Sequence, residues 1–310
     1  MATPPRITIL LPGLFVLLSL VAAASSQVSE RDRELAKAAE LTSEIVKLFD
    51  QKRYKDALPP ALKVVEVRRR LLAENDRSLA AAYTNLAEIY FQLKKDREAE
   101  DAFTDALTVY EKQTDPPSGA ISKTLERLAF LRFRKNDYAG ADRYYLRALE
   151  LKEKELGVSN PQTIAAMKNF GCLDLIAKAD NHALPEDSDE NKRRLRARAA
   201  CWLHEMSDDC ASIDPITRPD QGIVNSKAIK LTQPAYPAAA RSQGHAGNVF
   251  IAVLIGKEGT VIKTKSVCGG YPELIEAGVE AARASKFTPT LLNGQPVEVS
   301  GTIIYRFVAK

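Results

Sequence analysis

The sequence predicts two domains: an all-α repeat solenoid, followed by a small α+β domain with a three-stranded antiparallel sheet. The solenoid is predicted because residues 34–179 are rich in helix-forming residues and repeat their apolar pattern every 42 residues. The second domain is predicted because residues 227–310 change to alternating, β-branched segments separated by glycine turns. A chain of 310 residues, 45% of them hydrophobic, is long enough to build both cores.

The N-terminus has the pattern of an export signal. Arg6 is the only charge before the apolar run Ile7–Ala24, whose last three residues are alanines ahead of Ser25. We therefore expect residues 1–24 to be a cleaved signal peptide. The alternative is an inner-membrane anchor that is retained, because an apolar run of 18 residues is close to the length that spans a bilayer. Both alternatives predict an exported protein, either periplasmic or anchored and facing the periplasm.

The repeat within residues 34–179 is carried by small and large apolar residues in register. Small residues recur every 42 positions at Ala57, Ala99 and Ala141. A large–small pair recurs at the same spacing at Leu86-Ala87, Leu128-Ala129 and Phe170-Gly171. Each unit is expected to be two antiparallel helices, with small residues where the helices touch and large residues toward the next unit.

The second unit resembles the tetratricopeptide repeat (TPR). It contains Tyr83-x-x-Leu86-Ala87-x-x-Tyr90, followed by Ala99-x-x-x-Phe103. The third unit keeps Leu128-Ala129 and Ala141-x-x-x-Tyr145 but has Arg132 where an aromatic residue is usual. The 42-residue period and the turn Asn160-Pro161-Gln162-Thr163 are similar to the longer TPR units of kinesin light chains. This resemblance covers about half of the chain and implies a groove that binds extended peptides.

Residues 180–226 are expected to contain a capping helix and a linker. Leu195, Ala199, Trp202 and Met206 have helical spacing, so a helix over Asn191–Met206 could close the last repeat. The basic run Lys192-Arg193-Arg194, with Arg196 and Arg198, is interpreted as the solvated opposite face of that helix. Residues 207–226 contain prolines and a glycine and are read as the linker.

The C-terminal segment is expected to form a helix, two strands, a second helix and a strand. The strands are Gly247–Ile255, Thr260–Val267 and Val297–Val308, and the longer helix is Pro272–Ser285. The segment resembles the C-terminal domain of the TonB family. The residues that carry this resemblance are Tyr236-Pro237, Ala240-Arg241, Gly244, Gly247-x-Val249, Gly259-x-Val261, Phe287-x-Pro289, Gly294-x-Pro296-Val297 and Ile304-x-x-Phe307. Ser285 departs from the family, which usually has Trp there, and is expected to weaken packing of the helix end.

Two binding surfaces follow from these resemblances. The repeats imply a row of peptide-binding residues at Asn85, Arg127 and Asn169. Side-chain amides form hydrogen bonds with peptide backbones, and guanidinium groups pair with carboxylates. The alternative is that these three are ordinary exposed helix residues. The final strand is expected to accept a partner strand at its free edge, around Thr302, Ile304, Tyr305 and Phe307. The alternative is that a second copy covers this edge and forms a homodimer.

The four cysteines and three histidines predict no catalytic or metal site. Cys201 and Cys210 close a short loop and are candidates for a disulfide, because an exported chain is oxidised. Cys172 and Cys268 lie in different predicted domains and are expected to be small buried hydrophobes. The grouping of Cys201, His204 and Cys210 matches no common zinc spacing, and the chain contains no nucleophile elbow or phosphate-binding loop.

The sequence therefore predicts an adaptor or scaffold of the periplasm or cell envelope, without catalytic activity, cofactor or metal. Its expected partners are proteins, in particular an extended peptide of an envelope or outer-membrane protein. The net charge of +4 is too small to indicate a nucleic-acid partner, although residues 227–310 hold ten basic and five acidic residues. The alternative function is a TonB-type energy transducer for transport through outer-membrane receptors, which would need the N-terminal anchor.

Overall fold

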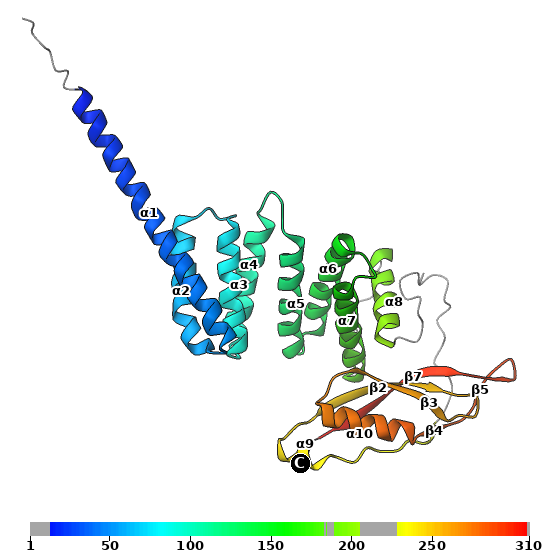
Figure 1. Cartoon of the computed structure of the whole chain (residues 1–310). Helices are drawn as coiled ribbons and strands as arrows, with labels where there is room; N and C mark the ends of the chain where they lie inside the picture. The colour runs from blue at the N-terminus through cyan, green and yellow to red at the C-terminus, as the bar shows by residue number, and fades with distance from the viewer. Residues whose placement is uncertain (1–12, 183, 185–188, 205–227, 309–310) are drawn as a thin grey trace, which may run out of the picture. The chain divides into compact units, whose positions relative to one another are not determined.

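The computed structural model describes residues 13–182, 184, 189–204 and 228–308. The chain divides into two compact units, Met1–Thr124 and Leu125–Lys310. Figure 1 shows helices along the N-terminal part of the chain and a small sheet with a long helix in the C-terminal part. This confirms the fold class predicted from the sequence, an α-helical repeat array followed by an α+β domain.

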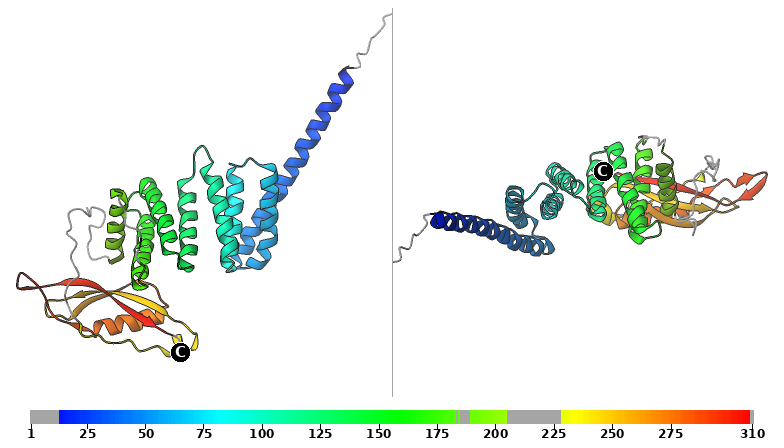
Figure 2. Two further views of the ribbon diagram at one scale, coloured as in Figure 1. Left: turned by 180° about the vertical axis from the view of Figure 1, so that it is seen from behind. Right: turned by 90° about the horizontal axis from the view of Figure 1, so that it is seen from above.

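The first unit is built from helices that pack in chain order. Its elements are α1 (Gly13–Asp50), α2 (Tyr54–Leu71), α3 (Arg77–Gln92), α4 (Asp96–Glu111) and the first turns of α5 (Ser118–Arg134). Helix α1 packs on α2, α2 on α3, and α3 on α4. The N-terminal half of α1 extends beyond α2 in every view (Figures 1 and 2). Within residues 13–182, 184, 189–204 and 228–308, no helix is both long and apolar enough to cross a membrane.

The 42-residue period is present in the backbone as well as in the side chains. Ala57 in α2, Ala99 in α4 and Ala141 in α6 (Tyr138–Leu156) are all fully buried, as the repeat requires. The turn before each of these helices contains one residue with positive φ, again 42 residues apart: Lys52 (58°), Lys94 (60°) and Asn136 (59°). A left-handed residue ends one helix and redirects the chain into the next. Every repeat therefore reverses its chain direction in the same way.

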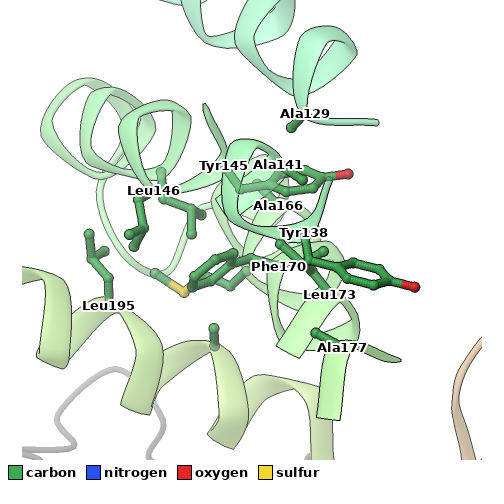
Figure 3. Packing of buried hydrophobic residues seen from close by; sticks show 13 residues of the cluster. Ala129, Tyr138, Ala141, Tyr145, Leu146, Ala166, Phe170, Leu173, Ala177 and Leu195 are labelled. Carbon is green, nitrogen blue, oxygen red and sulfur yellow. The ribbon is translucent and has the colours of Figure 1, made fainter. Parts of the chain in front are cut away.

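The second unit adds α6, α7 (Pro161–Ala179) and α8 (Glu190–His204) to the end of α5. Phe170 is 1% exposed and lies at the centre of their core, between Tyr145 and Leu195 (Figure 3). The hydroxyl groups of Tyr138 and Tyr145 point away from this cluster (Figure 3). Helices α6, α7 and α8 each begin at a side-chain cap. Asp137 accepts a hydrogen bond from the Gly140 amide (2.9 Å), Asn160 from the Gln162 amide (2.9 Å) and Asp189 from the Asn191 amide (2.8 Å).

Helix α8 closes the last repeat, but its basic residues are not all solvated. Leu195 and Ala199 are fully buried, as predicted. Arg196, however, forms a bidentate pair with Asp142 of α6 (2.7 and 2.8 Å), whose side chain is only 2% exposed. Arg198 is paired with Glu153 of the same helix. The prediction of a solvated face is wrong for these two arginines, because their acidic partners lie far away in the sequence.

The C-terminal domain contains one main sheet in the order β3–β2–β7, with antiparallel neighbours. Its elements are β1 (Ala228–Lys230), α9 (Ala238–Ser242), β2 (Gly247–Ile255), β3 (Val261–Cys268), α10 (Pro272–Arg283), β4 (Lys286–Phe287), β5 (Thr290–Leu292), β6 (Gln295–Val297) and β7 (Val299–Phe307). Strands β1 and β4 form a short ribbon, as do β5 and β6. Helix α10 contacts all three strands of the main sheet and covers one face (Figure 1).

Strand β2 is buried on both faces. Val249, Ile251 and Val253 pack with α10 in the domain core. Phe250 points to the other face, where it is fully buried with Leu175 and Ile176 of α7. A strand covered on both sides has a continuous apolar sequence instead of an alternating one. This explains why residues 249–255 contain no polar residue.

Ser285 does not leave the end of α10 loose. It is 1% exposed, its hydroxyl donates to the Ala281 carbonyl (2.9 Å), and it accepts from the Thr232 amide (3.1 Å). The Thr232 hydroxyl in turn donates to the Ala284 carbonyl (3.0 Å). A hydrogen-bonded polar contact therefore holds the segment after β1 against the end of α10, where the related family uses a large ring. The expectation that Ser285 weakens packing at the end of α10 did not include these hydrogen bonds.

The buried pair between α6 and α8 predicts the effect of one substitution. Asp142→Ala should destabilise the chain by about 1–3 kcal/mol, because the largely buried Arg196 would lose its bidentate pair with this carboxylate. Urea unfolding followed by circular dichroism measures this change. The exposed pair Lys63–Glu66 of α2 provides the control, and Glu66→Ala should leave the unfolding midpoint unchanged. Equal effects of the two substitutions would contradict this account of α8.

Candidate functional site

A pocket of about 310 Å³ lies among α5, α6, α7 and the turn after β3. We call it the groove pocket. It is lined mainly by apolar side chains: Phe130, Phe133, Tyr145, Asn169, Cys172, Leu173, Ile176 and Gly269. All eight belong to the second compact unit. Its size and lining suit an apolar side chain and not an ion.

One wall of the groove pocket is aromatic. The rings of Phe130 and Phe133, both on α5, lie 6.4 Å apart at their centroids. Phe133 also packs against Tyr138, at 5.9 Å. Phe130 is 37% exposed and lines the pocket. Neither phenylalanine can be recognised as part of a site from the sequence, because both have the spacing of ordinary core positions.

Polar groups lie at the margin of this aromatic wall. Asn169 is exposed on α7 and lines the groove pocket. Burial raises the pKa of Tyr145 to about 12; the nearby Glu126 carboxylate raises it further, and Arg127 acts in the opposite direction. Glu126 is paired with Lys152 at 3.3 Å. The pocket thus offers an amide at its margin, with a guanidinium near its tyrosine.

The three residues of the expected peptide-binding row are therefore only partly brought together. Arg127 and Asn169 lie on α5 and α7 of the second unit, and both are associated with the groove pocket. Asn85 is half-buried on α3, in the other compact unit, at the equivalent position of its own repeat. The peptide-binding role of all three remains a proposal.

The cysteine at the pocket wall corrects an expectation from the sequence. Cys172 of α7 is joined to Cys268 at the end of β3 by a disulfide, with the two Cα atoms 5.5 Å apart. The prediction that both are simple buried hydrophobes is wrong, since a bridge over 96 residues cannot be recognised from local pattern. Cys201 is also disulfide-bonded, while Cys210, its predicted partner, lies outside the described residues. An even cysteine count in an exported chain was the signal that could have suggested a second bridge.

The second expected surface is the outer edge of β7. This strand pairs with β2 along its whole length, and no other strand among the described residues joins the sheet on its outer side. The side chains of Tyr305 and Phe307 are buried in the core with α10. Thr302 is half-buried and Ile304 is 43% exposed, and both lie on the face of the sheet opposite α10. Only the backbone edge and the side chains of that opposite face can therefore contact a partner strand.

A second pocket, of about 390 Å³, lies between α7 and α8. Its floor is formed by small residues such as Gly171 and Ala199. The charged groups at its margin already have partners: Asp174 is paired with Lys178 (2.8 Å), and Arg196 with Asp142. Within the part of the chain that the structure describes, no group of His, Cys, Asp and Glu side chains could hold a metal ion.

Comparison with protein families identifies both parts of the chain. Residues 232–308 match the family of the Gram-negative bacterial TonB protein C-terminal domain. Residues 48–112 and 123–162 match two tetratricopeptide repeat families. The chain therefore contains TPR repeats followed by a TonB C-terminal domain, as its sequence motifs suggested.

Solved structures with related architecture have low sequence identity to this chain. A kinesin-light-chain protein of Podospora anserina with nearly identical TPR-like repeats is 13% identical over 56% of this chain and 89% of that one, with a TM-score of 0.41. BtubC from P. vanneervenii is 16% identical over 60% and 77%, with a TM-score of 0.35. The TonB C-terminal domain of Pseudomonas aeruginosa is 22% identical over 29% and 92%, with a TM-score of 0.25. No functionally curated protein matches this chain.

The two tyrosines around the groove pocket predict an alkaline transition. Burial raises the pKa of Tyr138 to about 12, helped by its hydrogen bond to Asp180, and burial also raises that of Tyr145 to about 12. A raised tyrosine pKa means that the neutral form is favoured on folding. This stabilisation is complete below pH ~10 and is lost as the pH rises toward ~12. Ultraviolet titration of tyrosinate should show these two residues ionising last, and Tyr138→Phe or Tyr145→Phe should each remove one equivalent from that step.

Proposed function

We propose that this chain, with its TPR repeats and its TonB C-terminal domain, is an exported adaptor of the cell envelope. It binds an extended peptide in the groove pocket and a partner strand at the edge of β7. The observation that carries this proposal is the groove pocket itself: an open aromatic wall beside an exposed amide, on the repeat helices. An apolar pocket with a few polar groups at its margin is a typical recognition site.

The chemistry of the groove pocket supports a peptide as its occupant. An apolar side chain of the peptide would be buried against Phe130 and Phe133, which supplies affinity. The Asn169 amide can donate to and accept from a peptide backbone at the same time. Arg127 adds a positive charge near the pocket, which suits a carboxylate on the peptide.

The edge of β7 supports a second partner. Its backbone groups lie in an extended strand, where another strand can add by main-chain hydrogen bonds. Ile304 offers an apolar side chain on the face that α10 does not cover. A homodimer through this edge would use the same groups and is the alternative occupant.

The disulfides support an exported location. Both Cys172 and Cys268 are oxidised, as is Cys201. Disulfides persist in the periplasm and in other oxidising compartments but are rare in the cytosol. The apolar run Ile7–Ala24, which lies partly outside the described residues, provides the export signal in this proposal.

A TonB-type energy transducer is the second candidate, favoured by the match of residues 232–308 to that family. It requires the N-terminal apolar run to remain in the inner membrane. Mass spectrometry of the protein from periplasmic and membrane fractions distinguishes the two. We expect the mature chain to begin at Ser25 in the periplasmic fraction. A full-length chain in the membrane fraction, with loss of receptor-dependent uptake on deletion, would support the transducer and contradict the adaptor.

Selection from a library of short random peptides tests the two surfaces on the full, oxidised chain. Peptides that bind the groove should share a bulky apolar residue, and Asn169→Ala should weaken them about five- to thirtyfold, as expected for loss of one or two hydrogen bonds. Ile304→Lys should weaken only peptides that bind the β7 edge, because a charge on an edge strand opposes pairing. The exposed residue Gln162 of α7 supplies the matched control, Gln162→Ala. Peptides whose affinity is unchanged by all three substitutions would show that neither surface is used.

A further inference from the structure

The Cys172–Cys268 disulfide joins two segments that are distant in the sequence. Cys172 lies in the middle of α7, and Cys268 is the last residue of β3, 96 positions later. The sulfur of Cys172 also lies 3.2 Å from the Val267 carbonyl oxygen. This bond therefore fixes the end of β3 directly against the last repeat.

Among the described residues, this junction also has noncovalent contacts, including contacts of α8 with β3. The apolar contact consists of the small cluster around Phe250 and Cys268, with Leu175, Ile176 and Ala179 of α7. The ion pair between Arg306 and Asp180 is long, at 3.7 Å, and Arg306 is 63% exposed, so solvent weakens it. Burial lowers the pKa of Lys265 in β3, and the charge of Lys168 in α7 lowers it further. The covalent bond therefore reinforces a junction whose apolar cluster is small.

The same bond forms part of the groove pocket. Cys172 lines the pocket from α7, and Gly269, the residue after Cys268, lines it from the turn after β3. Gly269 has a φ of 67°, and a Cβ there would lie 2.8 Å from the Asn248 carbonyl oxygen, so the turn approaches its neighbours closely. The position of this wall depends on the position of Cys268.

The two cysteines differ in exposure. Cys268 is 5% exposed and packed against Phe250. Cys172 is only partly buried and lines the groove pocket, whose volume of about 310 Å³ is large enough to admit a small thiol. An attacking thiolate must reach one sulfur of a disulfide, and we expect it to reach Cys172, the more exposed cysteine beside the pocket.

We propose that the Cys172–Cys268 bond is a site of thiol–disulfide exchange, reached through the groove pocket, and that its reduction by a dithiol takes the pocket apart. The loss of a bound peptide on reduction rests on the proposed function; the exchange and the opening of the junction do not.

The reaction is a two-electron exchange. One thiolate of the dithiol attacks the sulfur of Cys172, forming a mixed disulfide and releasing the Cys268 thiolate, which takes up a proton. The second thiol of the reductant, as a thiolate, then attacks the reductant's sulfur in the mixed disulfide. This releases the Cys172 thiolate, which takes up a proton. The dithiol leaves as a cyclic or intramolecular disulfide. Without the bond, the turn at Gly269 is free to leave α7.

The proposal also predicts a reciprocal effect of the peptide. A peptide in the groove pocket covers Cys172 and should slow its reduction. Because reduction lowers the affinity for the peptide, the peptide must favour the oxidised state by the same factor. Redox state and partner binding are then coupled at one bond.

Hydrogen exchange of the full chain, with dithiothreitol as the dithiol, tests the junction independently of any peptide. On reduction we expect exchange to become about tenfold faster in β2, β3 and the C-terminal half of α7, and to stay unchanged in α3 and α4, because these two helices contain no cysteine. Alkylation followed by peptide mass spectrometry confirms which cysteines are reduced. Unchanged exchange after complete reduction of Cys172 and Cys268 would overturn the proposal.

The double variant Cys172→Ser with Cys268→Ser, studied without reductant, should reproduce the reduced state. The matched control is Cys201→Ser with Cys210→Ser, which removes a disulfide-bonded cysteine away from the pocket and should keep the junction protected. If the double variant does not fold, the reduced wild-type chain gives the same comparison. A double variant as protected as the oxidised chain would contradict the role of the bond.

Peptides from the library selection provide the second readout. We expect a groove-binding peptide to lose about tenfold or more in affinity on reduction, and its saturation to shift the thiol–disulfide equilibrium with dithiothreitol toward the oxidised chain by the same factor. Equal affinity in both states, or an unchanged equilibrium with peptide bound, would overturn the coupling. If the library yields no groove-binding peptide, the proposed function fails, while hydrogen exchange still decides whether the bond holds the junction.

Discussion

The contact of Phe250 with α7 is the interaction on which the second unit depends. Strand β2 has apolar side chains on both faces, and α10 can cover only one of them. The other face needs a second layer, which α7 supplies. The last helices of a repeat array likewise have an apolar side without a following repeat, which a capping element must cover. The sheet thus covers an apolar surface of the repeats, and the repeats cover an apolar surface of the sheet. Without this contact both surfaces would be exposed to water.

The local physics of the repeats could be predicted from the sequence almost completely. The alanines at 42-residue spacing had to be buried, because only small residues allow two helices to approach closely, and all of them are. Strand β2 was predicted with its observed bounds, and β3 and α10 to within two residues at either end. The short strands β1, β4, β5 and β6 were not predicted, since ribbons of two or three residues leave no periodic signal.

What the sequence could not predict are contacts between distant segments. The sequence places Arg196 in a basic run that is typical of a solvated face. Its partner Asp142 lies 54 positions earlier, so no local pattern indicates the pair. Cys172 and Cys268 had no local feature that would pair them. In the candidate site, periodicity indicated Arg127 and Asn169, which share one helical position, but gave no sign that Phe130 and Phe133 form an open wall. An apolar residue at core spacing has the same pattern whether or not another side chain covers it.

The two ends of the repeat array differ in how freely they can change. The C-terminal end is closed by α8, by the sheet and by a covalent bond, so each of its residues is constrained by several others. Toward the N-terminus, the turns before α2 and α4 each contain one left-handed residue, 42 positions apart. Insertion of a whole 42-residue module there would keep the left-handed turns and the buried alanines in register. A longer repeat array would therefore need no new kind of turn and no new kind of helix contact.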